Sequence, residues 1–185
     1  WVTLSFAGAA GGIIEPANDP EQGEAQCRAY REKLGHSLAS GVLQAIIGGL
    51  RQPAPAPLRL RSKRLRIPLQ ADSLLRLALD LGLMDPRPLT GGRIETEAAL
   101  LRWGELSMLF LPGEPSPELG RDLEKGMDGD FRLVVGVALD ELGYLLSDRQ
   151  WGDERFEYER SMSVGPRAGS VMLESLNRLK EGGNL

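Results

Sequence analysis

The sequence is poor in the residues that most often carry catalysis or bind metals. It contains one histidine, His36, and one cysteine, Cys27, among 185 residues. A lone cysteine excludes an internal disulfide and any zinc cluster made of several cysteines. A lone histidine argues against histidine-dependent chemistry supplied wholly by these residues. Because His36 lies at the edge of a predicted helical apolar stripe, we expect no ligand or catalytic role for it.

Basic charge, aromatic residues and long apolar runs are also scarce. The formal net charge is −4 and aromatic residues make up 5% of the chain, so neither a positive footprint nor stacking platforms point to a nucleic-acid partner. No apolar run approaches the ~20 residues of a membrane-spanning helix, and no basic-then-apolar signal opens the sequence. We therefore expect a soluble chain without a transmembrane segment, either cytoplasmic or secreted. Its oligomeric state stays open.

What is present indicates one globular domain. Apolar residues make up 42% and charged residues 26%, which is typical of a folded soluble protein. The hydrophobic pattern predicts an α/β fold over residues 1–185, with a central mixed β-sheet packed by helices. Because residues 1–6 already show a strand pattern, we expect the sequence to be part of a longer protein. Strands are predicted at 1–6, 58–69, 93–103, 106–111 and 131–139, and helices at 21–47, 72–83, 117–125 and 167–180.

Two of these predictions have specific alternatives. Residues 58–69 alternate apolar and basic side chains, and the phase changes around Ser62-Lys63, which predicts a bulge or bend in a half-exposed strand. The five basic residues from Arg59 to Arg66 either protect an edge strand by charge or form an anion-binding face. Residues 93–103 and 106–111 are expected to form a hairpin around Gly104-Glu105, with a helix as the rival for residues 97–102.

Polar side chains follow two predicted strands at the points where each strand ends. The run 109–111 stops at Pro112-Gly113 and presents Glu114. The run 131–139 leads into Asp140-Glu141-Leu142-Gly143-Tyr144. Mixed α/β proteins often build sites from side chains that follow buried strands. The alternative is that these are ordinary turn residues at strand ends.

Four short islands together resemble the neutral (non-lysosomal) ceramidase family of zinc-dependent amidohydrolases. The islands are Phe6-Ala-Gly-Ala-Ala-Gly-Gly12 with Pro16, Leu111-Pro-Gly-Glu-Pro-Ser-Pro-Glu-Leu-Gly120, Val135-Gly-Val-Ala-Leu-Asp-Glu-Leu-Gly-Tyr144, and Tyr158-Glu-Arg-Ser-Met-Ser-Val-Gly-Pro166. They occur in the family's order and touch nearly the whole sequence. The resemblance implies the C-terminal portion of a catalytic region that hydrolyses an N-acyl amide bond.

The resemblance also implies roles for individual residues. Glu114 matches the zinc-ligating carboxylate of the family's Pro-Gly-Glu motif, and Tyr144 matches a tyrosine that approaches the zinc. Carboxylate and phenol oxygens suit zinc, and histidine nitrogens usually complete such sites. The glycines expected to line the site are Gly8, Gly11, Gly12, Gly113 and Gly143.

The sequence departs from the family pattern at three places. The family's two zinc histidines lie upstream of the glycine-rich turn, so zinc is expected only when that N-terminal segment of the same protein is present. Glu15 stands where the family has the catalytic serine, or an asparagine, before proline, which leaves the catalytic residue unknown. Leu139 replaces an asparagine before Asp140-Glu141.

Three functional hypotheses follow. The first is part of a ceramidase-like zinc hydrolase for a small-molecule or lipid-like amide, incomplete or inactive in isolation. The second is a family member that has lost catalysis and serves as a binding or structural domain. The third is that all four islands are fold-determining turns. We predict that Glu114 and Tyr144 lie close together, near the turn formed by residues 8–12.

Overall fold

The computed structural model describes residues 6–12, 23–49, 54–83, 86–87 and 89–181. The chain divides into two compact units, of which residues 13–55 form the smaller. The larger unit holds all the described strands and helices α2 to α6, and it has the predicted α/β architecture. Helix α1 belongs to the smaller unit, which the single-domain interpretation did not separate.

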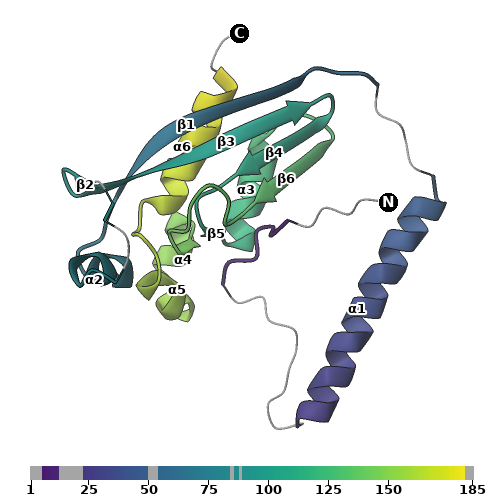
Figure 1. The fold of residues 1–185 in the computed structure, drawn as a ribbon, viewed down its shortest axis with the longest axis horizontal. Helices are drawn as coiled ribbons and strands as arrows, with labels where there is room; N and C mark the ends of the chain where they lie inside the picture. The colour runs from purple at the N-terminus through teal and green to yellow at the C-terminus, as the bar shows by residue number, and fades with distance from the viewer. Residues whose placement is uncertain (1–5, 13–22, 50–53, 84–85, 88, 182–185) are drawn as a thin grey trace. The chain divides into compact units, whose positions relative to one another are not determined.

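The main sheet is mixed and has the order β1-β3-β4-β6 (Figure 1). Strands β1 (Leu58–Pro68), β3 (Arg93–Trp103) and β4 (Leu106–Phe110) are antiparallel neighbours, and the short β2 (Leu89–Thr90) pairs with β3. The predicted hairpin around Gly104-Glu105 is confirmed, and the helical rival for residues 97–102 is wrong.

The predicted bulge in β1 is wrong. β1 pairs with β3 residue by residue from Leu58 opposite Trp103 to Pro68 opposite Arg93. The change of phase instead puts Leu60 on one face of an unbroken strand, 63% exposed, and Leu65 on the other, 6% exposed. β1 lies at the edge of the sheet.

β4 and β6 (Phe131–Val135) are parallel, and helix α3 (Pro117–Gly126) lies in the connection between them. Parallel neighbours need such a crossover. Helix α3 begins after Ser116, whose side chain accepts a hydrogen bond from the Leu119 amide, and Pro117 takes the first helical position. Proline and an acidic residue in the first turn, Pro117 and Glu118, are the pattern that predicts this helix.

The predicted strand at 131–139 ends early, at Val135. Val137 and Leu139 have φ angles of 51° and 71°. This left-handed conformation is costly for a residue with a side chain, most of all for a β-branched one, and it cannot continue a strand. The chain therefore turns at Val137, inside the run that the apolar pattern assigned to the strand.

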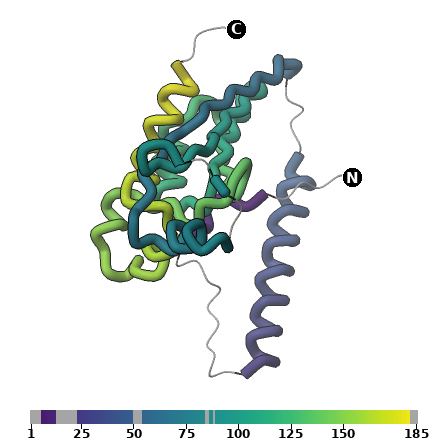
Figure 2. Tube along the Cα trace, turned by 60° about the vertical axis from the view of Figure 1, so that its left-hand side comes forward, coloured from purple at the N-terminus to yellow at the C-terminus, as the bar shows by residue number. Residues whose placement is uncertain are grey.

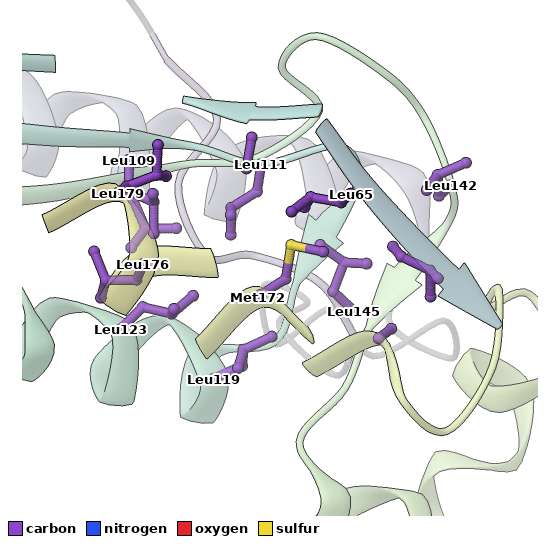
Figure 3. Packing of buried hydrophobic residues seen from close by; sticks show 14 of the residues in the cluster. Leu65, Leu109, Leu111, Leu119, Leu123, Leu142, Leu145, Met172, Leu176 and Leu179 are labelled. Carbon is purple, nitrogen blue, oxygen red and sulfur yellow. The ribbon is translucent and has the colours of Figure 1, made fainter. Parts of the chain in front are cut away.

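One face of the sheet packs against α3 and α6 (Ala168–Glu181), which also contact each other. Helix α6 runs along the sheet in both views, Figure 1 and Figure 2. Side chains of this face and of the two helices form the hydrophobic core in Figure 3, with Leu109, Leu111, Leu119, Leu145 and Met172 fully buried. Helices on one face and alternating burial along β3 confirm a half-covered sheet.

The other face of the sheet is apolar and largely uncovered in the described part of the chain. The register places Leu58, Trp103, Leu106 and Phe131 in one row across the four strands. Of these, Leu58, Trp103 and Phe131 are 65%, 44% and 64% exposed. Leu133, two residues along β6, is 46% exposed.

The remaining helices lie beyond the strand ends. Helix α2 (Leu74–Asp80) is shorter than the predicted helix 72–83, and its N-cap is Ser73. The sequence pattern predicts a loop over residues 148–160, but the structure has three short helices there: α4 (Asp148–Trp151), η2 (Glu154–Phe156) and α5 (Glu157–Ser161). The closing helix α6 confirms the prediction for residues 167–180.

Helix α1 (Glu24–Ile47) confirms the long helix expected at 21–47, but its predicted apolar stripe is not buried. Leu34, Leu38, Val42 and Ile46 recur at helical spacing, and no residue of the helix is buried. The helix ends at Gly48, whose amide donates to the carbonyls of Gln44 and Ile46. Among the described helices, none is long and apolar enough to cross a membrane.

Candidate functional site

Two short parallel strands place Glu114 directly opposite Tyr144. Strand β5 (Glu114–Pro115) follows β4, and β7 (Tyr144–Leu145) follows β6. Because β4 and β6 are parallel, their carboxyl ends meet at the same edge of the sheet. The segments that follow these two strands form a second parallel pair, β5 and β7. The prediction that Glu114 and Tyr144 lie close together is therefore confirmed.

Backbone hydrogen bonds join the segment that links β4 to β5 with the segment that links β6 to β7. The Leu111 amide donates to the Val135 carbonyl at 2.9 Å, and the Val137 amide to the Gly113 carbonyl at 2.8 Å. At the site itself, the Glu114 amide donates to the Gly143 carbonyl at 2.9 Å. These bonds fix the relative position of Glu114 and Tyr144 through the main chain rather than through their side chains.

The glycine-rich turn 6–12 lies against the same edge of the sheet, as predicted. The Gly11 amide donates to the Pro115 carbonyl, and the Gly136 amide to the Ala7 carbonyl, both at 2.9 Å. A Cβ atom at Gly11 would overlap the Glu114 carbonyl group, so this close approach requires glycine. At Gly8 a Cβ would make only an ordinary contact, 3.9 Å from the Val134 carbonyl oxygen.

The other predicted glycines also lie around the pair. A Cβ at Gly113 would come within 2.5 Å of the Gly143 carbonyl oxygen. Gly12 has a φ of 75°, and a Cβ added to it would lie 3.2 Å from Oε1 of Glu159. Of the five glycines named from the sequence, Gly11, Gly113 and Gly143 therefore lie directly against the backbone of the β5–β7 pair or belong to its turn, whereas Gly12 lies beside Glu159 and Gly8 beside Val134.

The electrostatic environment of the pair disfavours negative charge. Burial, and then the nearby Glu141 carboxylate, raise the pKa of Glu114 above its usual value. Burial raises the pKa of Tyr144, and the carboxylates of Glu114, Glu159 and Glu141, together with Tyr158, raise it further. Burial and neighbouring acidic side chains therefore both favour the neutral forms of Glu114 and Tyr144.

The structure adds Glu159 and Tyr158 to the neighbourhood, which the sequence did not assign to the site. Glu159 is only 7% exposed, and its Oε2 atom has no hydrogen-bond partner among the described residues. The rings of Tyr144 and Tyr158 lie 6.1 Å apart at 60°. The island 158–166 was the available signal, but a glutamate within a charged run such as 153–160 resembles a solvated surface residue.

Asp140, one of the polar residues after β6, belongs to the framework instead. Its carboxylate accepts hydrogen bonds from Arg87 Nη1 at 2.5 Å and from Thr96 Oγ1 at 2.8 Å. Burial alone would raise its pKa, but these bonds and that from the Glu141 amide hold the pKa below its usual value. Leu139 beside it has a φ of 71° and is 60% exposed, a conformation that asparagine tolerates better than leucine.

The remaining sequence-predicted residues do not complete a site. His36 lies on the exposed surface of α1, and Glu15 lies outside the described residues. Within the described ranges, no group of three or more histidine, cysteine, aspartate or glutamate side chains is arranged to hold a metal ion. The described residues therefore do not form a complete metal site by themselves.

Comparison with known proteins shows a partial similarity to a solved structure. No protein-family model matches the sequence, and no curated protein matches it. The structure of the neutral ceramidase from Pseudomonas aeruginosa is similar at a TM-score of 0.46 and 14% sequence identity. The similarity covers 69% of this chain and 29% of that chain. A similarity at this level does not define a family, so the function is argued from the residues.

Substitution of Glu114 in β5 and of Glu118 in α3 should have opposite effects on stability. Because the pKa of Glu114 is raised, its ionised form is disfavoured in the folded state. The stabilisation of the folded state by the neutral Glu114 side chain is therefore fully present below the unfolded pKa and is lost as the pH rises through the folded pKa. Glu114→Gln should therefore raise the urea midpoint at pH 7 in metal-free buffer. An unchanged or lower midpoint would contradict an unfavourable environment for the carboxylate.

Glu118 provides the matched control. Hydrogen bonds from Arg149, and then from Ser147, lower its pKa, with Ser147 Oγ donating at 2.7 Å. The stabilisation of the folded state by the ionised Glu118 side chain is present above the unfolded pKa and is lost as the pH falls through the folded pKa. Glu118→Gln should lower the urea midpoint at pH 7, and the difference from wild type should shrink as the pH falls through the lowered pKa of Glu118 in the folded protein.

Proposed function

We propose that this chain is part of a zinc-dependent hydrolase that cleaves an N-acyl amide bond, with Glu114 and Tyr144 as two of the zinc ligands. The observation that carries the proposal is their direct opposition in the β5–β7 pair, beside the turn 8–12. The resemblance to neutral ceramidases implies these two roles, and the two residues come from islands thirty positions apart in the sequence.

The chemistry of the two donors fits zinc. Carboxylate and phenol oxygens both bind this ion, and a tetrahedral site takes four ligands. Burial and the surrounding carboxylates disfavour ionisation of Glu114 and Tyr144, and a divalent cation would reverse that preference because its charge inverts the local electrostatics. Two further ligands, expected to be histidines, must come from outside the described residues.

The chain's own residues would hold and orient the ligands. The Glu141 Oε1 atom accepts a hydrogen bond from the Gly143 amide at 2.9 Å, which fixes the turn just before Tyr144. The Gly143 carbonyl in turn accepts from the Glu114 amide, so both ligands are set by one short backbone loop. Zinc, when bound, would polarise an amide carbonyl or activate water.

Zinc content tests the proposal. We would measure zinc per chain in a polypeptide long enough to include the family's upstream histidine segment, with Glu114→Ala as the variant. Glu105→Ala, in the exposed turn between β3 and β4, is the matched control. We expect about one zinc in wild type and control and at least a tenfold loss of affinity in Glu114→Ala, because a protein ligand is removed.

The other outcomes separate the remaining hypotheses. If neither wild type nor variant retains zinc, the chain is a binding or structural domain that has lost the metal chemistry. If zinc is retained equally in Glu114→Ala, Glu114 is no ligand and the four islands are fold-determining turns. Only loss of zinc in the variant together with loss of N-acyl amide hydrolysis supports the enzyme.

A further inference from the structure

A pocket lined by three arginines lies at the other end of the sheet, where β4 and β6 begin. Its volume is about 250 Å³, and it is lined by Ala56, Pro57, Arg59, Arg61, Leu100, Arg102 and Gly104. No acidic side chain is among these residues. Leu100 is buried and supplies an apolar floor, while the three guanidinium groups supply the charge.

The strand register sets two of these arginines against each other. Arg59 on β1 is directly opposite Arg102 on β3, and like charges directly opposite each other destabilise a sheet. Arg61, two residues along β1, points to the same face because side chains alternate along a strand. The structure therefore places positive charges together where they do not stabilise the sheet.

The arginines differ in how far their hydrogen bonds are already satisfied. Arg61 Nη1 donates to the Leu179 and Lys180 carbonyls at the end of α6, at 3.0 and 3.2 Å, which holds its guanidinium in place. Arg102 Nη1 lies 3.4 Å from Asp128 Oδ2, and Asp128 is also shared with Lys180 at 3.1 Å. Arg59 has no hydrogen bond or ion pair among the described residues.

We propose that this pocket binds a phosphate monoester, with Arg59 and Arg102 as its principal donors and Arg61 as a fixed third positive charge. Each guanidinium presents a planar fork of N–H groups that matches a phosphate in bidentate fashion. A phosphate monoester carries a charge of about −1.5 to −2 at pH 7. This charge suits Arg59, which is unpaired among the described residues, beside Arg102, whose partner Asp128 is shared with Lys180. A carboxylate, with a single charge, suits it less.

This assignment also divides the basic stretch of β1 into two parts. Arg66 pairs with Glu95 on β3 at 2.9 Å and is 61% exposed in its side chain, as expected for charge that protects an edge strand. Arg59 and Arg61 line the pocket instead. The two interpretations of this stretch thus apply to its two ends, and the proposal does not depend on the zinc site.

Phosphate binding by the full chain tests the proposal. We would titrate the protein with inorganic phosphate at millimolar concentrations by calorimetry, at constant ionic strength and with acetate as the competitor anion. Arg59→Gln is the variant. Arg64→Gln is the matched control, because Arg64 lies on the same strand outside the pocket and loses the same charge. We expect at least a tenfold loss of phosphate affinity in Arg59→Gln and no change in Arg64→Gln.

The melting temperature without phosphate separates a binding role from a structural one. If the arginines are kept for an anion, Arg59→Gln should melt no lower than wild type, because it relieves the like-charge pair. Equal phosphate binding by Arg59→Gln and wild type, or no measurable binding by wild type, would overturn the proposal. So would a lower melting temperature of Arg59→Gln with unchanged phosphate binding.

The source of the phosphate monoester is a separate arm of the same experiment. Sedimentation with vesicles that contain phosphatidic acid, against vesicles of phosphatidylcholine alone, tests a lipid headgroup. Binding to the phosphatidic acid vesicles that is lost in Arg59→Gln would support a lipid source. Binding of inorganic phosphate without vesicle binding would support a soluble phosphate ester.

Discussion

Replacing Gly143 with alanine is expected to lower the free energy of unfolding by more than about 3 kcal/mol. Gly143 has a φ of 72°, and an added Cβ would overlap the carbonyl oxygen of Met162. The residue also forms an isolated antiparallel bridge with Ser163. Neither the backbone of residue 162 nor the conformation of residue 143 can adjust without breaking this contact, so the cost combines strain and steric overlap.

The same substitution should disturb the candidate site. The Gly143 carbonyl accepts the hydrogen bond of the Glu114 amide, so displacement of Gly143 moves Tyr144 relative to Glu114. Urea denaturation measures the loss of stability, and hydrogen exchange at the Glu114 and Ser116 amides reports the local change. Both amides should exchange faster in Gly143→Ala, beyond the increase that global destabilisation produces.

Gly91→Ala is the matched control for this prediction. Gly91 has a φ of 58°, also in the left-handed region, but an added Cβ would meet nothing within 4 Å. Its cost should therefore be the conformational term alone, about 1 kcal/mol. If Gly143→Ala is no less stable than Gly91→Ala, the close passage of residues 143 and 162 is not a feature of the protein.

Truncation of Leu111 to alanine should cost about 2–5 kcal/mol, because it leaves a cavity in a close-packed core. Leu111 is fully buried and lies between β4 and β5, in the cluster that contains Met172 and Leu145 (Figure 3). Its backbone amide and carbonyl are both bonded to the chain after β6, to the Val135 carbonyl and the Ala138 amide. The surrounding chain is therefore held in place and can relax only partly into the space.

Leu133→Ala gives the comparison for this substitution on the neighbouring strand. Leu133 lies on the uncovered face of β6 and is 46% exposed, so truncation leaves no closed cavity and should cost less than about 1 kcal/mol. Urea denaturation of both variants measures the difference. Equal losses in Leu111→Ala and Leu133→Ala would mean that both faces of the sheet are covered in the folded protein.

Local patterns were enough to predict most elements of the larger unit. Regular alternation along 93–103 predicted β3 with its ends at the observed residues, because period-two burial reflects one covered face. Pro117 and Glu118 predicted the start of α3, because a proline and an acidic residue in the first turn act within one turn of the chain. These features depend only on neighbours in the sequence.

Predictions failed where the determining contact is distant in the sequence. The apolar run 131–139 gave no indication that Val137 and Leu139 would adopt positive φ angles; hydrogen bonds from Val137 and Ala138 to Gly113 and Leu111 impose that turn. The phase change in β1 suggested a bulge, whereas pairing with β3 keeps the strand regular and leaves Leu60 exposed. Burial and pairing are properties of the sheet and not of one strand.

The candidate site divides in the same way. The sequence by itself determined that Glu114 and Tyr144 follow β-rich runs that end in glycine turns, and the resemblance named both as zinc ligands, a role that stays a prediction. Only the tertiary structure decided that they face each other, since the crossover through α3 makes β4 and β6 parallel and brings their carboxyl ends to one edge. It also placed Glu159 beside Gly12 and set Arg59 against Arg102, because burial and cross-strand register arise only when segments distant in the sequence pack together.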